Sequence, residues 1–301
     1  MAELYKVGIS LSNMYLKNKK PKKAEKILMD LYSKDTINGF IARNIGLCGY
    51  KQADSKKSIK WFSRAIKLDS TDIKAYKFLF TVYAAKEEYD LAFEIMDLAL
   101  NVDPENIDLY RMIGDLHVVR NHNFRAITEY LKAFEIDSND EEIARKLGLC
   151  YYKIKKYEKA KYYLLIASKE LDLNVYTHLG YIYKRFNESD SSTMFFTKAL
   201  DIIRPDNNSL FDIYVNVAEN YYSLNNYNHT IGWYKRSLKL ELAGVWMNDS
   251  KNKVLVDLAS VYADKLNDKE NAIKYLKEVT KDIFINDDKY YEYAQKQITK
   301  I

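Results

Sequence analysis

The sequence is poor in the two residues that form tight turns. Its 301 residues include three prolines and nine glycines, while 48% are hydrophobic and 30% are charged. An all-β domain of this size needs many tight turns, which depend on glycine and proline. The composition therefore argues against a turn-rich β fold. It predicts long helices with polar connections around a sizeable apolar interior.

Long apolar runs are missing as well. No segment approaches the roughly 18–20 consecutive apolar residues that span a bilayer, so we expect no transmembrane helix. The N-terminal segment has no basic stretch followed by an apolar run, which a secretory signal peptide would show. We therefore expect a cytoplasmic protein without a membrane span.

The motifs of common catalytic sites are absent from the sequence. It contains no glycine-rich phosphate loop, no GxSxG, no HExxH and no paired CxxC. His117 and His122 are five residues apart, a spacing that directs them to different sides of a helix, so we expect no metal site there. The sequence thus predicts no enzymatic activity, no cofactor and no metal.

The excess of positive charge is small. The formal net charge is +5 and the pI is near 8.7. Dedicated nucleic-acid-binding domains are usually more basic. Nucleic acid is therefore not the expected partner.

What the sequence does contain is a repeat of 34 residues. The same helical position recurs at Leu31, Ala65, Ala99, Ala133 and Ala167. With the repeats aligned, position 8 is usually small, position 11 is usually tyrosine and position 20 is usually alanine. Small residues let helices approach closely, and we expect the tyrosine beside them to fill the remaining space. Such a period is typical of stacked units that present a surface to partners.

The repeat pattern resembles that of the tetratricopeptide repeat family. The segments IKAYKFLFTVYAAKEEYDLAFEIMDLALNVDP and ARKLGLCYYKIKKYEKAKYYLLIA carry the small, aromatic and alanine positions of that family. The resemblance extends from Tyr5 to about Thr280. It implies an all-α fold, a right-handed superhelical solenoid of antiparallel helix pairs. In this family the first helix of each pair lines a concave groove.

We expect residues 1–301 to form a single solenoid. The expected repeats lie near residues 5–38, 39–72, 73–106, 107–140, 141–172, 173–206, 211–244 and 252–285, the last divergent, followed by a capping helix at 287–301. The spacing between equivalent residues changes to 32, 38 and 41 in the second half of the chain, where we expect the stack to be less regular.

Charged and aromatic residues of the first helices form a candidate binding surface. Position 5 is a cation in four consecutive repeats, at Arg43, Lys77, Arg111 and Arg145. Positions 12 and 13 add further residues to this face, among them Tyr50, Tyr152 and Lys184. Because guanidinium groups bind carboxylates in a bidentate manner, the stripe favours a peptide of acidic character. A merely solvated charged face is the alternative.

One subgroup of the family suggests a second set of candidate residues. Its co-chaperone members hold the C-terminal carboxylates of heat-shock proteins with five polar residues from three adjacent repeats. Asn13, Asn44 and Lys74 match three of these positions, but Ile9 and Phe78 stand where cations would be. The loss of two cations disfavours such a clamp, because a carboxylate in the groove would lack a partner.

The resemblance implies a protein–protein interaction scaffold or adaptor that binds a peptide segment in its groove. A structural alternative is a homo-oligomer or a subunit of a larger complex, which would use the convex faces or the insertion after residue 240. A regulatory peptide sensor and an RNA binder that uses the basic groove are further alternatives.

Overall fold

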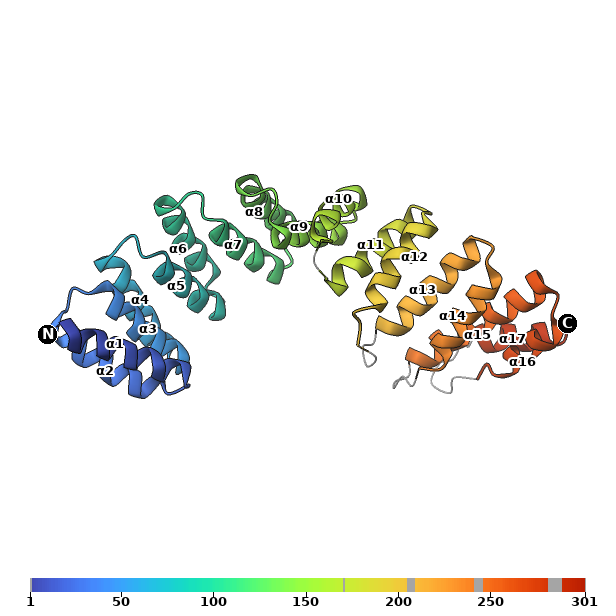
Figure 1. The fold of residues 1–301 in the computed structure, drawn as a ribbon, viewed down its shortest axis with the longest axis horizontal. Coiled ribbons are helices and arrows are strands. Elements are labelled where there is room, and N and C mark those ends of the chain that lie inside the picture. The colour runs from blue at the N-terminus through green and yellow to red at the C-terminus, as the bar shows by residue number, and fades with distance from the viewer. Residues whose placement is uncertain (1, 170, 205–208, 241–245, 281–288, 301) are drawn as a thin grey trace. The chain divides into compact units, whose positions relative to one another are not determined.

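The computed structural model describes residues 2–169, 171–204, 209–240, 246–280 and 289–300. Every regular element within these ranges is a helix, which confirms the all-α prediction (Figure 1). None of the described helices is both long and apolar enough to cross a bilayer. The chain divides into two compact units, Met1–Cys150 and Tyr151–Ile301, which we call Unit 1 and Unit 2.

Unit 1 consists of antiparallel helix pairs that follow one another along the chain (Figure 1). Its helices are α1 (Ala2–Lys17), α2 (Pro21–Lys34), α3 (Gly39–Lys51), α4 (Ser55–Leu68), α5 (Ile73–Ala85), α6 (Tyr89–Val102), α7 (Ile107–Val119), α8 (Asn123–Ile136) and most of α9 (Glu141–Lys153). The odd-numbered helices are the first members of the pairs.

Unit 2 continues the same alternation of helices. Its helices are α10 (Tyr157–Ala167), α11 (Leu173–Arg185), α12 (Ser189–Leu200), α13 (Ser209–Ser223), α14 (Tyr227–Leu238), α15 (Trp246–Ser260), the π-helical turn η1 (Val261–Lys265), α16 (Lys269–Lys277) and α17 (Lys289–Ile298). The insertion expected after residue 240 begins in residues 241–245, which lie outside the described ranges, and continues into the start of α15.

Polar side chains at one repeat position start the first helices of Unit 1. The side chains of Asn38, Asp72 and Asn106 each accept a hydrogen bond from the backbone N–H three residues ahead, at 3.1, 3.3 and 3.3 Å. Each helix begins at the next residue. These N-caps satisfy N–H groups that have no partner within the helix. The 34-residue spacing of the caps therefore sets the spacing of the helices.

A residue in the left-handed conformation closes the turn inside each helix pair. These residues have φ between 52° and 61°, and none of the eight is glycine: Lys19, Ala53, Glu87, Asn121, Lys155, Asn187, Asn225 and Asn267. In the first seven turns the next N–H bonds to a carbonyl five residues earlier, as Glu88 N does to Tyr83 O at 3.0 Å, and in the last, after η1, Asp268 N bonds to Tyr262 O, six residues earlier, at 2.8 Å. This is the Schellman closure, which satisfies a carbonyl at the helix end. The spacing of these left-handed residues thus follows the sequence repeat and its changes in the second half of the chain.

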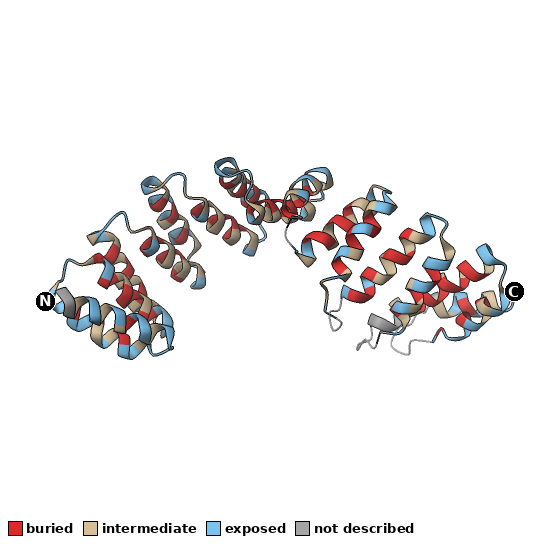
Figure 2. Ribbon diagram, in the orientation of Figure 1, coloured by how far each residue is buried: buried red, intermediate tan, exposed pale blue. Residues whose placement is uncertain are grey.

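Glycines at position 8 let aromatic rings pack directly on the first helices. A Cβ on Gly114 would lie 2.4 Å from Cε1 of Tyr130. The same contact recurs between Gly46 and Phe62 and between Gly180 and Phe196. The ring comes from position 24 of the second helix, whereas the sequence pattern assigned it to the tyrosine at position 11. The buried faces therefore lie between the paired helices (Figure 2).

Two cysteines and the histidine considered as a metal ligand are part of the packed interior. Cys48 and Cys150 are buried free thiols, and burial raises the pKa of Cys48 to about 12. His117 is 8% exposed and stacks on Phe93 with ring centroids 4.7 Å apart. Among the described residues, no three His, Cys, Asp or Glu side chains are grouped as metal ligands would be.

Candidate functional site: charged side chains on the first helices

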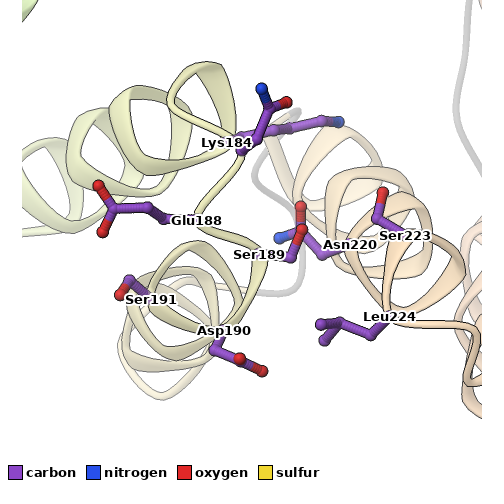
Figure 3. A pocket seen from close by; sticks show the side chains of 9 residues that line it. Lys184, Glu188, Ser189, Asp190, Ser191, Asn220, Ser223 and Leu224 are labelled. Carbon is purple, nitrogen blue, oxygen red and sulfur yellow. The ribbon is translucent and has the colours of Figure 1, made fainter.

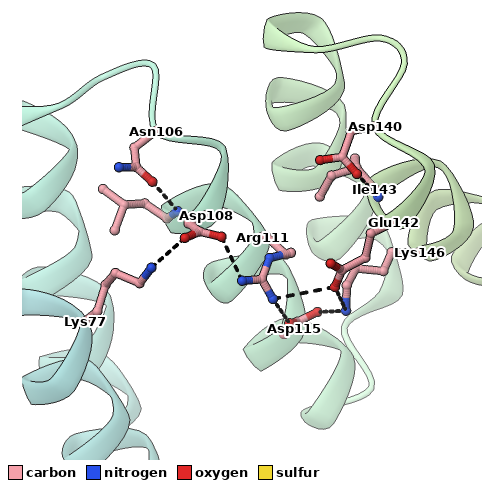
Figure 4. A network of polar contacts seen from close by, with 10 residues as sticks. Lys77, Asn106, Asp108, Arg111, Asp115, Asp140, Glu142, Ile143 and Lys146 are labelled. Carbon is pink, nitrogen blue, oxygen red and sulfur yellow. Dashed lines mark hydrogen bonds and ion pairs between the residues drawn. The ribbon is translucent and has the colours of Figure 1, made fainter. Parts of the chain in front are cut away.

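Charged side chains from successive first helices of Unit 1 meet in one continuous network (Figure 4). We call it the charge ladder. It consists of Lys77 on α5, Asp108, Arg111 and Asp115 on α7, and Glu142 and Lys146 on α9. Because α5, α7 and α9 each contribute at least one residue, the ladder depends on the stacking of three consecutive repeats.

One end of the ladder joins α5 to α7. Lys77 Nζ donates to Asp108 Oδ2 at 2.6 Å, and Arg111 Nη2 donates to Asp108 Oδ1 at 2.8 Å. The hydrogen bonds from Lys77 and then Arg111 hold the pKa of Asp108 below its ordinary value. The hydrogen bond to Asp108 likewise raises the pKa of Arg111. Both oxygens of this carboxylate are therefore engaged by cations.

The other end of the ladder joins α7 to α9. Arg111 Nη1 lies 3.8 Å from Asp115 and 3.6 Å from Glu142, and Lys146 Nζ donates to Asp115 Oδ1 at 2.7 Å. The buried hydroxyl of Tyr130 also donates to Asp115 Oδ1, at 2.6 Å. Burial and the Asp115 carboxylate raise the pKa of Tyr130. Asp115 is thus held by the buried Tyr130 hydroxyl and also paired with the cations Lys146 and Arg111.

Arg43 forms a separate and more enclosed contact between repeats. Its Nη1 donates to Asp72 Oδ1 at 2.5 Å, and the two side chains are 15% and 8% exposed. Its guanidinium also lies over the Phe40 ring, 5.0 Å from the centroid. Asp72 is the N-cap of α5. Arg43 therefore ties α3 to the start of α5.

The three positions that match the co-chaperone set have different surroundings. Asn13 on α1 and Lys74 on α5 are exposed. Lys74 has no ion-pair partner among the described residues. Asn44 on α3 is buried, and its Nδ2 donates to the backbone oxygen of Phe40 at 2.8 Å. The amide of Asn44 is therefore used within its own helix.

Two further predicted residues lie on first helices of Unit 1 outside the ladder. Arg145 is partly buried on α9, next to Lys146 in the sequence. Tyr50 is exposed near the end of α3. The structure thus places the predicted stripe on successive first helices. It brings Lys77 and Arg111 together through one shared carboxylate.

The two predicted residues of Unit 2 are also engaged. The Tyr152 ring packs edge-on against His178, with centroids 4.6 Å apart, and burial raises the pKa of Tyr152. Lys184 Nζ donates to Asn216 Oδ1 at 2.6 Å and pairs with Glu219. Tyr152 is therefore an aromatic packing residue, while Lys184 belongs to a polar cluster.

That cluster is a shorter version of the charge ladder. Glu219 on α13 pairs with Lys184 on α11 and, at 3.1 Å, with Lys253 on α15. Burial opposes ionisation of Glu219, but the hydrogen bond and charge of Lys184, together with Lys253, outweigh it and lower the pKa. Three consecutive first helices are again joined through a carboxylate.

The sequence analysis missed these carboxylates although a signal for them exists. Partners lie about one repeat apart: 29 residues from Arg43 to Asp72, 31 from Lys77 to Asp108 and 35 from Lys184 to Glu219. A search for acids 29–35 residues after each position 5 or 12 cation would have found them. The surface is therefore of mixed charge, with acids set between the predicted cations.

A family model described as tetratricopeptide repeat matches residues 173–206 and 253–281. A TPR repeat-containing protein of Methanocaldococcus jannaschii is 27% identical over 81% of this chain and 41% of its own length. The anaphase-promoting complex subunit 3 of Schizosaccharomyces pombe is 26% identical over 38% of this chain and 17% of its own. The chain thus spans well under half the length of these relatives.

Solved structures with the same repeat architecture support the fold. The C-terminal part of a TPR repeat-containing protein from Cytophaga hutchinsonii matches with a TM-score of 0.65 and 17% identity, covering 80% of this chain and 98% of that one. The pilF protein of Pseudomonas aeruginosa matches with a TM-score of 0.56 and 15% identity, covering 72% and 96%. At these identities the likeness concerns the fold alone.

Proposed function

Because the chain is a tetratricopeptide repeat protein, we propose that it is a non-enzymatic scaffold that binds a peptide segment of another protein on the first helices of Unit 1. Proteins with these repeats generally mediate protein–protein interactions and complex assembly. The charge ladder carries the proposal. Its six side chains are held by mutual contacts, yet they remain 18–52% exposed.

The energetics of the ladder favour recognition over a purely structural role. Ion pairs with this exposure typically contribute only about 0.2–1 kcal/mol each to stability. Charged groups that are already fixed lose little side-chain entropy on binding, which favours affinity. A ladder whose ion pairs add little to stability and whose side chains are already positioned suits the binding of a polar segment.

We propose that the bound segment has an acidic character. Lys74 is exposed and unpaired within the described part of the chain, and the half-exposed Arg111 is placed to share its donors with an incoming carboxylate. Arg43 and Asn44 are largely enclosed, so the more exposed Lys74, Lys77 and Arg111 are the proposed principal contacts, together with Arg145 of the predicted stripe. The exposed Asn13 and Tyr50 extend this surface, and Tyr152 and Lys184 are the corresponding contacts of Unit 2.

Quantitative capture from a lysate of the source cells tests this proposal. The ladder variant Lys77→Glu/Arg111→Glu is compared with wild type and with Lys60→Glu/Lys132→Glu. The latter has the same change in net charge on the second helices α4 and α8. We expect the ladder variant to recover the partner at least about tenfold less well, with the control unchanged. Equal recovery by the ladder variant would refute the proposal.

An apolar stripe on α6 supports a second candidate, a fixed subunit of a larger complex. Leu91, Leu98 and Val102 are exposed and lie on one face of this second helix, since they are separated by seven and four residues. Two relatives are named as anaphase-promoting complex subunits. In this case Leu91→Lys/Leu98→Lys would reduce partner recovery while the ladder variant retained it. Light scattering over a dilution series would separately detect a homo-oligomer.

A further inference from the structure

Unit 2 contains a polar pocket that shares only Lys184 with the surfaces discussed so far. It has a volume of about 610 Å³ and lies between the first turn of α12 and the end of α13 (Figure 3). Ser189 and Asp190 line it from α12, and Asn220, Ser223 and Leu224 line it from α13 and the turn that follows. The polar groups of these side chains determine which ligand the pocket can bind.

The orientation of the Asn220 amide follows from its buried partner. Asn220 is 1% exposed, and Ser192, also buried, is its hydrogen-bond partner at 2.8 Å. The Ser192 hydroxyl donates its only proton to Gly180 O, at 2.8 Å, so it can only accept from Asn220. The amide must therefore direct its NH₂ group to Ser192. Its oxygen Oδ1 accepts no hydrogen bond from any described residue and remains available to the pocket.

The other polar groups of the pocket also offer acceptors. The Ser223 hydroxyl donates to Glu219 O at 3.0 Å, which leaves its oxygen lone pairs as the available function. Lys184, the cation at the rim, donates to Asn216 and pairs with Glu219. The donors of Lys184 and Ser223 are thus engaged within the protein itself.

Asp190 supplies an unpaired carboxylate to this pocket. Within the described residues its carboxylate has neither an ion pair nor a hydrogen bond, whereas the nearby Glu188 lies 3.7 Å from Lys161. Leu224 is 40% exposed and provides an apolar wall beside the carboxylate. Asp190, Asn220 and Leu224 together suit a ligand with positive charge, several donors and an aliphatic portion.

We propose that this pocket binds an arginine side chain of a partner protein. The guanidinium group has five N–H donors in a fixed plane, which can pair with Asp190 while also reaching Asn220 Oδ1 and the Ser223 hydroxyl. The aliphatic stem packs on Leu224. The inference rests on the proposed protein-binding function. It adds a basic anchor on the partner, distinct from the acidic segment proposed for Unit 1.

Nuclear magnetic resonance of the ¹⁵N-labelled full chain tests the inference. The probe is the peptide acetyl-Gly-Ser-Arg-Ser-Gly-amide, and the matched peptides carry citrulline or lysine in place of arginine. Citrulline keeps the shape of arginine but has no charge. We expect saturable shifts at the backbone amides of Ser189, Asp190, Ser223 and Leu224, with a Kd of about 1–10 mM for a single side chain. The citrulline peptide should cause no saturable shift.

Two single variants show whether the carboxylate carries the binding. Asp190→Asn should weaken binding of the arginine peptide about tenfold or more, because a charge-assisted hydrogen bond is lost. Glu188→Gln, a neutralisation at the same rim, should change it less than threefold. Equal binding of citrulline, equal or tighter binding of lysine, shifts only outside the pocket or an unaffected Asp190→Asn variant would each overturn the inference.

The ladder variant separates this inference from the proposed function. Lys77→Glu/Arg111→Glu should bind the arginine peptide as wild type does, since both changes lie in Unit 1. If peptide binding fails while partner capture still depends on the ladder, the pocket assignment is wrong and the proposed function stands. If the arginine peptide binds while partner capture does not depend on the ladder, the proposed function is wrong and the pocket assignment stands.

Discussion

Replacing Gly114 with alanine tests the packing that positions the charge ladder. The new Cβ would lie 2.4, 2.7 and 2.9 Å from Cε1, Cδ1 and Cζ of Tyr130, whereas ordinary contacts are 3.4–4 Å. The ring must therefore retreat by roughly 1 Å within a packed core. Tyr130 is 1% exposed and its hydroxyl donates to Asp115 at 2.6 Å, so this movement strains or breaks the hydrogen bond.

The expected cost of this substitution is the sum of three effects. Overpacking costs about 1–3 kcal/mol. Loss of a hydrogen bond to a carboxylate costs roughly 1.5–3 kcal/mol if it is complete. Alanine recovers about 0.8–1 kcal/mol of helix propensity. We therefore expect Gly114→Ala to lower the free energy of unfolding by about 1.5–5 kcal/mol, measured by urea denaturation followed by circular dichroism.

Gly232 provides a matched control for the substitution. It lies inside α14, is exposed, and a Cβ there would have no neighbour within 4 Å. Gly232→Ala should therefore stabilise the chain by up to about 1 kcal/mol, through helix propensity alone. If both substitutions stabilise the chain equally, the Gly114–Tyr130 contact does not limit packing and the reasoning is refuted.

Three further predictions concern protonation, turn strain and the ladder. Burial and nearby cations lower the pKa of His117 to about 4, so between about pH 6.5 and 4 the unfolded chain binds a proton that the folded chain does not. The free energy of unfolding should therefore fall by about 2–3 kcal/mol as the pH drops through that window. His117→Tyr should remove this loss in urea titrations at different pH values. Ala53→Gly should raise the thermal midpoint, gaining up to about 1 kcal/mol because φ is 57° there. Asp108→Asn should cost under about 1 kcal/mol in the same assay, because its ion pairs with Lys77 and Arg111 are half-exposed.

Each of these predictions has an outcome that contradicts it. An unchanged pH slope in His117→Tyr would mean that this imidazole titrates normally in the folded chain. Destabilisation by Ala53→Gly would mean that the left-handed turn is not strained. If Asp108→Asn lowered the free energy of unfolding by well over about 1 kcal/mol, the ladder would mainly stabilise the fold, which would count against its role in recognition.

The period of the sequence predicted the helices well because local chemistry repeats with it. The N-caps Asn38, Asp72 and Asn106 recur every 34 residues and directly determine where helices begin. The period also predicted the small residue at position 8. It did not predict that the ring on Gly114 comes from Tyr130, because two aromatic positions of the repeat could reach that space.

The candidate site was harder to predict from the sequence than the fold was. The cations at position 5 were found, but the sequence pattern left their charges unpaired. Their carboxylate partners depend on the distance between adjacent first helices, as the contacts of Arg43 with Asp72 and of Lys77 with Asp108 show. The pocket at Asn220 could not be predicted either, because it depends on the Ser192 hydroxyl donating its only proton to Gly180 O.

The central claim is that Unit 1 binds its partner through the first helices. Hydrogen–deuterium exchange of the chain, alone and with the captured partner, tests it most directly. We predict slower exchange on binding in α5, α7 and α9, the helices that carry the ladder, with little change in α6 and α8. Protection confined to α6 and α8 would contradict the claim and assign the partner to the opposite surface.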